Sequence, residues 1–592
     1  MMKNPPKKSS DNQKPDKKAG FEHINQRIGQ KIKKDIVTCA RKMELSNYQK
    51  IYRNVDDSPG FALAKRITGS RCVKAFSQQK IVIMQKSLLE SIKGKPEFKV
   101  GLHNKQEYNA TLLATSEFPN HPSEYPEIEG ETYTTLIEWQ GGPKFADLTS
   151  INGIPVDIDV SQLDNVTINE GGGAGNRPPG EPIVEGNTSS VTPFPVQSDY
   201  KKIISDFKIG TIKSNAVTVA VTDTGNLFLR TEYLSSQNKQ LRNFPLYQNT
   251  KLTYPAGYCS VLKYLDPNYR KQMIKQGTGN QPNSNNDVLG SPYDDNAARH
   301  GTTVSAIIAQ NPLNGTDSSA RILPVKCFDF LGAANLFDIL CGFNYIFSRI
   351  KSDNIRIVNA SWGFYAPQEK EEQLQMLRKK IAALKKENVF VVTSAGNRPE
   401  LVEPAHDLNQ GAIYPACFRS DDLDNLITVT SVTYKLEHST TGTDTAFLDK
   451  NTLKKLKEDL EDGTQIVEGK LIEVENYSSK YVDIGVIAHP VQGLFSSPFK
   501  DKSGKNNAPA IVSGSSFAAA YVSAYLAELL CAQPEIKTKS EFFNQLDDIQ
   551  TSTDLVKITA EGRYLKLPIK EYDQAIQYVA NNILQSDVDI DS

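Results

Sequence analysis

The sequence predicts an α/β protein built on a mainly parallel central sheet, with a small α+β domain near the amino terminus. Short apolar segments alternate with longer helix-like segments between residues 217 and 531. The short segments are apolar at nearly every position, as expected for parallel strands buried on both faces. Such alternation indicates a three-layer arrangement with helices on both faces of the sheet. The 592 residues exceed one typical domain, so a large unit and a smaller one are expected.

The elements of the large unit can be assigned in chain order. In the segment 371–386, apolar residues recur at spacings of three and four, which makes one helical stripe of Leu374, Leu377, Ile381 and Leu384. The expected strands are 217–221, 322–325, 355–360, 389–393 and 426–432, and the expected helices are the stretch after His300, 336–350, 371–386 and 516–531.

The segment before this unit, residues 21–160, is mixed in composition and is predicted to be the small α+β domain. The segments 80–84 and 133–139, rich in β-branched and aromatic residues, are predicted to be strands. A short helix is expected at 87–92.

Composition predicts the connecting and terminal segments. Residues 1–20 are rich in Lys, Pro, Ser and Asn and have little to bury, so they are expected to be a disordered basic tail. Residues 161–194 are expected to be a linker, because 169–182 is rich in glycine and proline. The large domain is assigned to 195–584, with a closing helix at 569–583 and an acidic tail at 585–592.

Charge and cysteine content narrow the class of protein. The 68 basic residues balance 69 acidic ones, for a net charge of -1, so nucleic acid and membranes are not expected as partners. Seven scattered cysteines without a C-x-x-C pattern indicate neither a disulfide framework nor a metal site. No signal-like segment or spanning apolar run is found. We therefore expect a cytoplasmic protein.

Three short motifs carry side chains suited to nucleophilic catalysis. Asp223-Thr224-Gly225 follows the strand 217–221, His300-Gly301-Thr302 opens a helix-like stretch, and Ser516 lies in Gly514-Ser515-Ser516-Phe517-Ala518. A serine becomes a nucleophile when a base lies within hydrogen-bond reach and an acid orients that base. The chain order Asp, His, Ser is one of three in which this triad occurs on unrelated folds.

In these motifs the chain resembles the subtilisin-like serine proteases, the subtilases. The family signatures D-[ST]-G, H-G-T-x-V and G-T-S-x-A are matched at 223–225, 300–304 and 514–518, with Ser515 in place of the threonine. The segment 389–397 is similar to the family's strand that ends in an oxyanion-hole asparagine. The resemblance covers residues 195 to 580, about two thirds of the chain.

The resemblance implies a role for each of these side chains. Ser516 would be the nucleophile, His300 its general base, and Asp223 the carboxylate that orients the imidazole. The side chain of Asn397 and the backbone N–H of Ser516 would form the oxyanion hole. No cofactor is expected for this chemistry.

The resemblance also implies a substrate-binding region. Ser361-Trp362-Gly363 and Ser394-Ala395-Gly396 are similar to the family's walls of the pocket for the residue before the cleaved bond. Trp362 replaces a common leucine, so aromatic bulk near that pocket is expected.

Several positions depart from the family pattern. Thr303 stands where a second histidine is frequent, and Ala520-Tyr521 replaces a common Pro-His. Neither change removes a proton-transfer or oxyanion group. Calcium sites occur in relatives, but they are built from scattered loop oxygens, and no spacing here identifies one.

Two functional hypotheses remain open at this stage. The first is an active serine endopeptidase acting on polypeptides, with residues 21–160 inhibiting, chaperoning or targeting it, alone or with a regulatory protein partner. The second is a catalytically silent scaffold that keeps the fold to bind peptides or a partner protein.

Overall fold

The computed structural model describes most of the two predicted domains. The described residues are 79–142, 148–155, 160–162, 165–168, 212–226, 257–262, 292, 294, 300–309, 317–328, 332–365, 371–397, 407–410, 412–418, 423–437, 467–473, 475–487, 491–496, 509–512, 514–545 and 549–565. All of them lie in one compact unit formed by residues 74–184 and 191–592.

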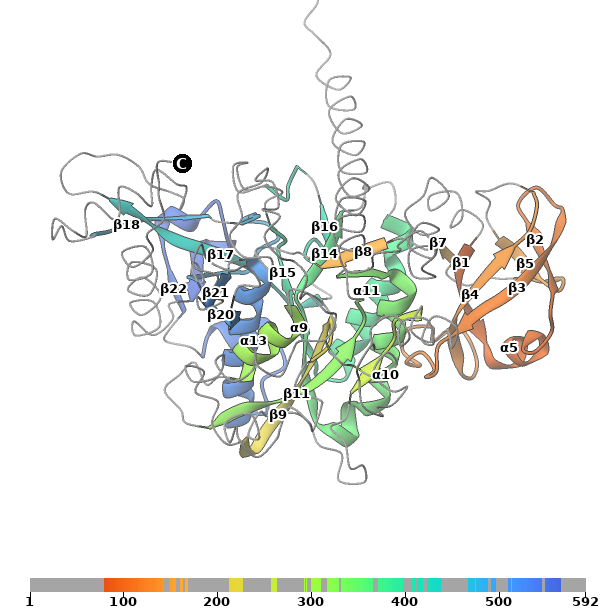
Figure 1. Cartoon of the computed structure of the whole chain (residues 1–592), viewed down its shortest axis with the longest axis horizontal. Coiled ribbons are helices and arrows are strands. Elements are labelled where there is room, and N and C mark those ends of the chain that lie inside the picture. The colour runs from red at the N-terminus through yellow and green to blue at the C-terminus, as the bar shows by residue number, and fades with distance from the viewer. Residues whose placement is uncertain are drawn as a thin grey trace, which may run out of the picture. The chain divides into compact units, whose positions relative to one another are not determined.

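A ten-stranded, largely parallel sheet forms the centre of the large domain (Figure 1). The strands, in spatial order, are β10 (Tyr258–Cys259), β11 (Ser318–Lys326), β9 (Ile212–Asp223), β13 (Ile355–Ala360), β15 (Phe390–Ser394), β17 (Leu426–Glu437), β19 (Ile484–Ile487), β23 (Arg563–Leu565) and β22 (Ile549–Thr551), with β18 (Val467–Glu473) on β17. All pairs from β10 to β23 are parallel, while β22 and β18 pair antiparallel. The predicted α/β fold class is confirmed.

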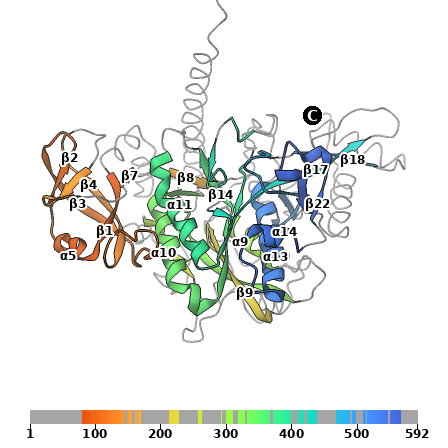
Figure 2. The same ribbon diagram turned by 180° about the vertical axis from the view of Figure 1, so that it is seen from behind.

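Helices cover both faces of this sheet. They are α9 (His300–Ala309), α10 (Leu336–Asp353), α11 (Glu371–Lys386), α13 (Ser515–Ala532) and the short α14 (Lys539–Phe543). In β9, Val219 and Val221 pack in the cluster of α9 and α13, whereas Ala220 packs in the cluster of α10 and α11. Because successive side chains of a strand point to opposite faces, one strand contributes to both cores. Figure 2 shows α10 and α11 together, with α13 on the other side of the sheet.

Helix α13 lies in the core of the large domain. Of the described helices, it is the one long and apolar enough to cross a membrane, and 89% of that 18-residue stretch is buried inside the fold. Burial all round explains why its sequence is apolar on every face.

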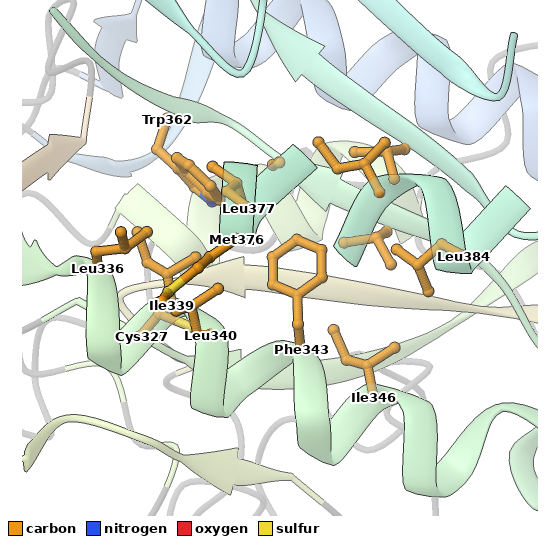
Figure 3. Close-up of a cluster of buried hydrophobic side chains, with 14 of the residues drawn as sticks. Cys327, Leu336, Ile339, Leu340, Phe343, Ile346, Trp362, Met376, Leu377 and Leu384 are labelled. Atoms are coloured by element: carbon orange, nitrogen blue, oxygen red, sulfur yellow. The ribbon is translucent and has the colours of Figure 1, made fainter. Parts of the chain in front are cut away.

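Helix α10 has defined ends and a large apolar face. The side chain of Asn335 accepts from Asp338 N, the side chain of Asp338 accepts from Asn335 N, and Asn354 ends the helix in the left-handed conformation. Figure 3 shows Phe343 reaching from α10 toward Leu377 and Leu384 of α11. These two helices are therefore joined to the sheet by one continuous apolar core.

The amino-terminal part is a separate antiparallel sheet of seven strands. Its spatial order is β6 (Ile154–Pro155), β5 (Leu148–Ile151), β2 (Phe98–Leu102), β3 (Glu107–Thr115), β4 (Thr132–Trp139), β1 (Gln79–Gln85) and β7 (Val160–Gln162). Helix α5 (Lys86–Ile92) packs Leu89 and Ile92 into its own core, which includes Trp139. This sheet and helix, together with the segment 116–131 that joins β3 to β4, are called the N-terminal domain below.

A short strand from beyond the N-terminal domain pairs with the large domain. It is β8 (Asn165–Ile168), which lies between β12 (Ala333–Asn335) and β14 (Trp362–Tyr365) in a four-stranded sheet completed by β16 (Ile413–Tyr414). Both of its pairings are antiparallel, and Thr167 faces Ala333 on one side and Gly363 on the other. A further hairpin joins β20 (Val491–Ser496) to β21 (Pro509–Val512).

Most predicted elements occur where expected, but several bounds differ. The boundary expected at residues 160/161 falls inside β7, and the expected linker includes β8, because both segments find strand partners far away in the chain. Strand β9 begins five residues earlier than the predicted 217–221, at Ile212. The tails, the Gly/Pro-rich 169–182 and the helix expected at 569–583 lie outside the described residues.

The core between α10 and α11 predicts a large stability effect at Phe343. Replacing this fully buried ring by Ala removes the transfer energy of the ring and leaves a cavity, so Phe343→Ala should lower the free energy of unfolding by about 3–5 kcal/mol. The partly exposed Leu113→Ala in β3 is the control, with an expected loss under about 1 kcal/mol. Urea denaturation followed by circular dichroism measures both, and equal losses would contradict this account of the core.

Candidate active site

Asp223 is the last residue of β9 and is completely buried at the carboxyl edge of the sheet. The backbone N–H of Thr224 donates to Asp223 Oδ1 at 2.6 Å, and Gly225 then turns the chain with φ of 110°. A parallel sheet collects functional groups at this edge, because all of its strands end there. The turn therefore holds the carboxylate in a fixed orientation.

His300 is the first residue of α9 and lies against this carboxylate. Its Nδ1 atom is 2.9 Å from both Oδ1 and Oδ2 of Asp223, and both side chains are buried. An ionised carboxylate can only accept, so Nδ1 carries the proton of this hydrogen bond. Nε2 is then the basic nitrogen of the neutral imidazole, as a general base requires.

Close backbone approach makes this contact possible. A Cβ atom on Gly301 would lie 2.5 Å from the carbonyl oxygen of Gly225 and 3.0 Å from Asp223 Oδ1. The N–H of Gly301 donates to Thr224 Oγ1 at 2.9 Å. Glycine after the histidine is therefore a steric requirement of this contact.

The structure adds four supporting residues to which sequence reasoning gave no role, Thr224, Asp294, Thr302 and Lys326. Lys326 Nζ donates to the carbonyl oxygen of Thr224 at 2.5 Å, and Asp294 accepts from both N and Oγ1 of Thr302. Thr224 thus contacts Asp223, Gly301 and Lys326. Only the match of 300–304 and 223–225 to family motifs hinted at Thr224 and Thr302, and nothing in the sequence singled out Asp294.

Ser516 lies in the first turn of α13, on the same side of the sheet as α9. Gly514, two residues before Ser516, occupies the N-cap position of the helix and has φ of 141°, a conformation that favours glycine. The hydroxyl of Ser516 donates to the carbonyl oxygen of Ser361 at 3.0 Å. The ring of the next residue, Phe517, has its centroid 5.7 Å from that of His300. The structure therefore brings Ser516 to the same edge of the sheet as Asp223 and His300.

Asn397 follows β15 and is held by the residue before Ser516. Its Oδ1 atom accepts from the backbone N–H and from the hydroxyl of Ser515, both at 2.9 Å. Because a backbone N–H can only donate, the accepting atom must be the amide oxygen. Nδ2 then occupies the other branch of the amide, next to the start of α13. The serine that replaces the family's threonine at 515 supplies both of these bonds.

Of the residues expected to flank the substrate, Ser361 and Gly363 make contacts at the site, whereas the side chain of Trp362 lies in the core. Ser361 Oγ lies 2.9 Å from two acceptors, the carbonyl oxygen of Ser516 and Asn359 Oδ1, and its single proton can be donated to either. The backbone of Gly363 pairs with β8. The aromatic bulk expected near the pocket at Trp362 stays a prediction; in this structure the side chain is 0% exposed, donates to Thr222 Oγ1 at 3.0 Å and packs beside Phe328. It faces the core because β14 alternates its side chains.

The other expected wall lies at the end of β15. Ser394 and Ala395 are buried, and Ala395 N donates to the carbonyl oxygen of Val429. Gly396 has φ of 86° and leads into Asn397. This segment therefore places the asparagine at the carboxyl edge of the sheet.

Other nucleophiles and metal ligands have a less suitable environment. Burial raises the pKa of the Cys417 thiol to about 12 and raises those of Cys327 and Cys341 as well, so these thiols stay protonated at neutral pH. Within the described ranges, no group of three or more His, Cys, Asp or Glu side chains is arranged to hold a metal ion.

A comparison with protein families identifies the family to which most of the large domain is similar. The sequence model of the subtilase family, peptidase S8, matches residues 214–560. No curated protein matches the chain.

The solved structures similar to this chain include a processing protease, a keratinolytic enzyme and a cytotoxin. The epidermin leader peptide processing serine protease of Staphylococcus aureus is 14% identical, with a TM-score of 0.41, covering 86% of this chain and 99% of that one. Fervidolysin from Fervidobacterium pennivorans is 15% identical, with a TM-score of 0.39, covering 86% and 61%. The subtilase cytotoxin SubAB is 16% identical, with a TM-score of 0.37, covering 66% and 98%.

The tight approach at Gly301 predicts a specific loss of the Asp223–His300 contact. In Gly301→Ala, the added methyl group must displace the Gly225 carbonyl or the Asp223 carboxylate, so the low-field proton signal of His300 Nδ1–H should disappear from the NMR spectrum. Gly485→Ala, whose Cβ would meet only side chains within 3.5 Å, should keep that signal. An unchanged signal in Gly301→Ala would contradict the assigned geometry.

Proposed function

This chain belongs to the subtilase family, and from that premise we propose that it is a serine endopeptidase regulated by its N-terminal domain. The proposal depends chiefly on one observation, the buried hydrogen bond between Asp223 and His300 at the edge of the sheet where Ser516 begins α13.

The proposed reaction has two steps with the same acid and base. Ser516 Oγ attacks the peptide carbonyl carbon while its proton passes to His300 Nε2, and the imidazolium is stabilised by Asp223. His300 then gives this proton to the leaving nitrogen as the C–N bond breaks, leaving an acyl ester on Ser516. A water molecule attacks the ester in the same manner, which releases the carboxylic acid and restores the serine.

Two donors would stabilise the oxyanion of each step. They are Asn397 Nδ2, oriented by the bonds of its oxygen to Ser515, and the backbone N–H of Ser516 at the start of α13. The helix N-terminus adds favourable potential for negative charge. This chemistry uses side chains and backbone alone and needs no cofactor.

Substrate entry would also prepare the serine for attack. A hydroxyl has one proton, and in this structure that of Ser516 is directed to the carbonyl oxygen of Ser361. A bound peptide that donates its own N–H to this carbonyl would compete for the acceptor. The Ser516 hydroxyl would then turn toward His300.

The position of β8 supports regulation by the N-terminal domain. An extended polypeptide substrate would bind by adding a strand to the edges of β12 and β14. In this structure β8 pairs with both strands. The chain would thus block its own site until β8 leaves, which suits a protease kept in the cytoplasm and released by a regulatory partner or by processing.

Labelling by a fluorophosphonate tests the proposed nucleophile. We expect the wild-type chain, or a processed form of it, to react at Ser516, and Ser516→Ala to lose both the label and peptide hydrolysis. Ser523→Ala, two turns further along the same helix, should retain the label. Absence of labelling in every processed form would favour the silent scaffold instead.

A proline in β8 tests the proposed block. Thr167→Pro removes the only N–H that this residue can give to β12 or β14, so the basal hydrolysis of a short peptide by the full chain should rise about tenfold, equivalent to ~1.4 kcal/mol. Thr167→Ser keeps the N–H and should behave as wild type. Equal rates for all three proteins would rule out inhibition by this strand.

A further inference from the structure

A buried lysine joins the large domain to the N-terminal domain. Lys380, in the middle of α11, is 0% exposed, although lysine is almost never fully buried without a partner. Its ammonium group forms a 2.7 Å ion pair with Glu124 Oε2 and donates to Asn120 Oδ1 at 2.9 Å and to Asn344 Oδ1. The three protons of the ammonium thus face three acceptors. Two of these acceptors come from the N-terminal domain and one from α10.

The two acceptors from the N-terminal domain are each held by hydrogen bonds within that domain. Asn120 accepts from Thr134 Oγ1 at 2.7 Å and donates to Thr132 Oγ1 at 3.2 Å, both in β4. Glu124 Oε1 accepts from His121 N at 2.8 Å, which leaves Oε2 directed at the lysine. Little side-chain entropy is therefore lost when the domains dock.

On the large domain, Asn344 of α10 hydrogen-bonds both to Lys380 and to the N-terminal domain. Its Nδ2 donates to the carbonyl oxygen of Phe118 at 3.2 Å and to Asn120 Oδ1 at 3.1 Å. Its Oδ1 accepts from Lys380. Both polar atoms of this amide are thus used at the interface.

We infer that Lys380 and Asn344, called the Lys380 site below, form a recognition surface on α10 and α11 for the segment 116–131 of the chain's own N-terminal domain, with Glu124 as the acidic group recognised. The inference rests on the proposed regulation by that domain, because docking of the domain is what would hold β8 in place.

Selectivity is the main consequence of a buried pair of this kind. Replacing a buried ion pair by apolar groups is often neutral, whereas removing one partner leaves an uncompensated charge and is strongly unfavourable. Burial lowers the pKa of Lys380, and the nearby Glu124 carboxylate opposes that shift. A protein segment without an acidic side chain at this point would leave the ammonium buried and unpaired, so it would be rejected.

The contacts around the pair are of ordinary interface types. Phe118 of the N-terminal domain packs edge-on against Tyr258 and Tyr345, and His121 stacks on Phe347 at 4.9 Å. These ring contacts provide buried apolar area. His121 Nε2 also lies 3.4 Å from Glu387 Oε1, but those two side chains are partly exposed, whereas the Lys380–Glu124 pair is buried. The main selective element is therefore the Lys380 site.

Hydrogen exchange of β8 amides tests this inference in the full chain carrying Ser516→Ala, which prevents self-cleavage. Lys380→Met and Glu124→Gln should each speed exchange at residues 165–168 by roughly 100-fold, the effect of one buried charge left unpaired. Glu124→Gln keeps the oxygen that accepts from His121 N. The double variant should return close to the parent rate, because neither charge remains.

The matched control is Lys385→Met, the same substitution in the last turn of α11, at a partly exposed lysine that pairs with Asp424 of the large domain. It should leave β8 exchange unchanged, since surface pairs contribute little. Three outcomes would overturn the inference: single variants that behave like Lys385→Met, a double variant at least as fast as either single one, or equal acceleration at Ile81–Ile83 in β1, which would mean that the N-terminal domain itself unfolds. Because the readout needs no activity, failure of the peptidase proposal would appear only in the labelling experiment.

Discussion

The hydrogen bond between Asp223 and His300 is the contact on which the candidate site depends. It requires the end of β9, the start of α9 and the absence of a side chain at Gly301. Since both partners are buried, solvent does not compete for the bond, and the imidazole has one tautomer that suits proton transfer. Thr224 and Lys326 secure the turn that presents the carboxylate. Every later step of the proposed chemistry follows from this fixed base.

Placement of the serine depends on the buried helix α13. Its small and apolar residues let it pack against β9, β13, β15 and α9 at once, which fixes the position of its first turn. Gly514, Ser515 and Asn397 then connect that turn to the end of β15. The same sheet edge carries β14, so a strand paired there lies beside the proposed nucleophile. The proposed inhibition follows from the fold, because β8 pairs with the edge that a substrate would need under that proposal.

Local patterns were sufficient to predict much of this arrangement. The strand 355–360 and the helix 371–386 can be recognised from the apolar residues within each short segment. The motifs around Asp223, His300 and Ser516 are likewise short and contiguous in the sequence. The pairing of β8 with β12 and β14 was missed, because it joins short segments without periodicity that lie far apart in the chain. Lys380 reads as a solvent-facing residue until a second domain covers it. For Trp362, sequence alone does not tell which face of β14 its side chain takes, so its burial could not be predicted.

The central claim is that Asp223, His300 and Ser516 act together on one acyl group. A crystal structure of the chain after reaction with a peptidyl phosphonate would test it most directly. The account predicts a covalent bond from phosphorus to Ser516 Oγ, His300 Nε2 within hydrogen-bond distance of the adduct, and a phosphonyl oxygen bound by Asn397 Nδ2 and Ser516 N. An adduct on another residue, or a His300 ring that remains out of reach of a labelled Ser516, would contradict it.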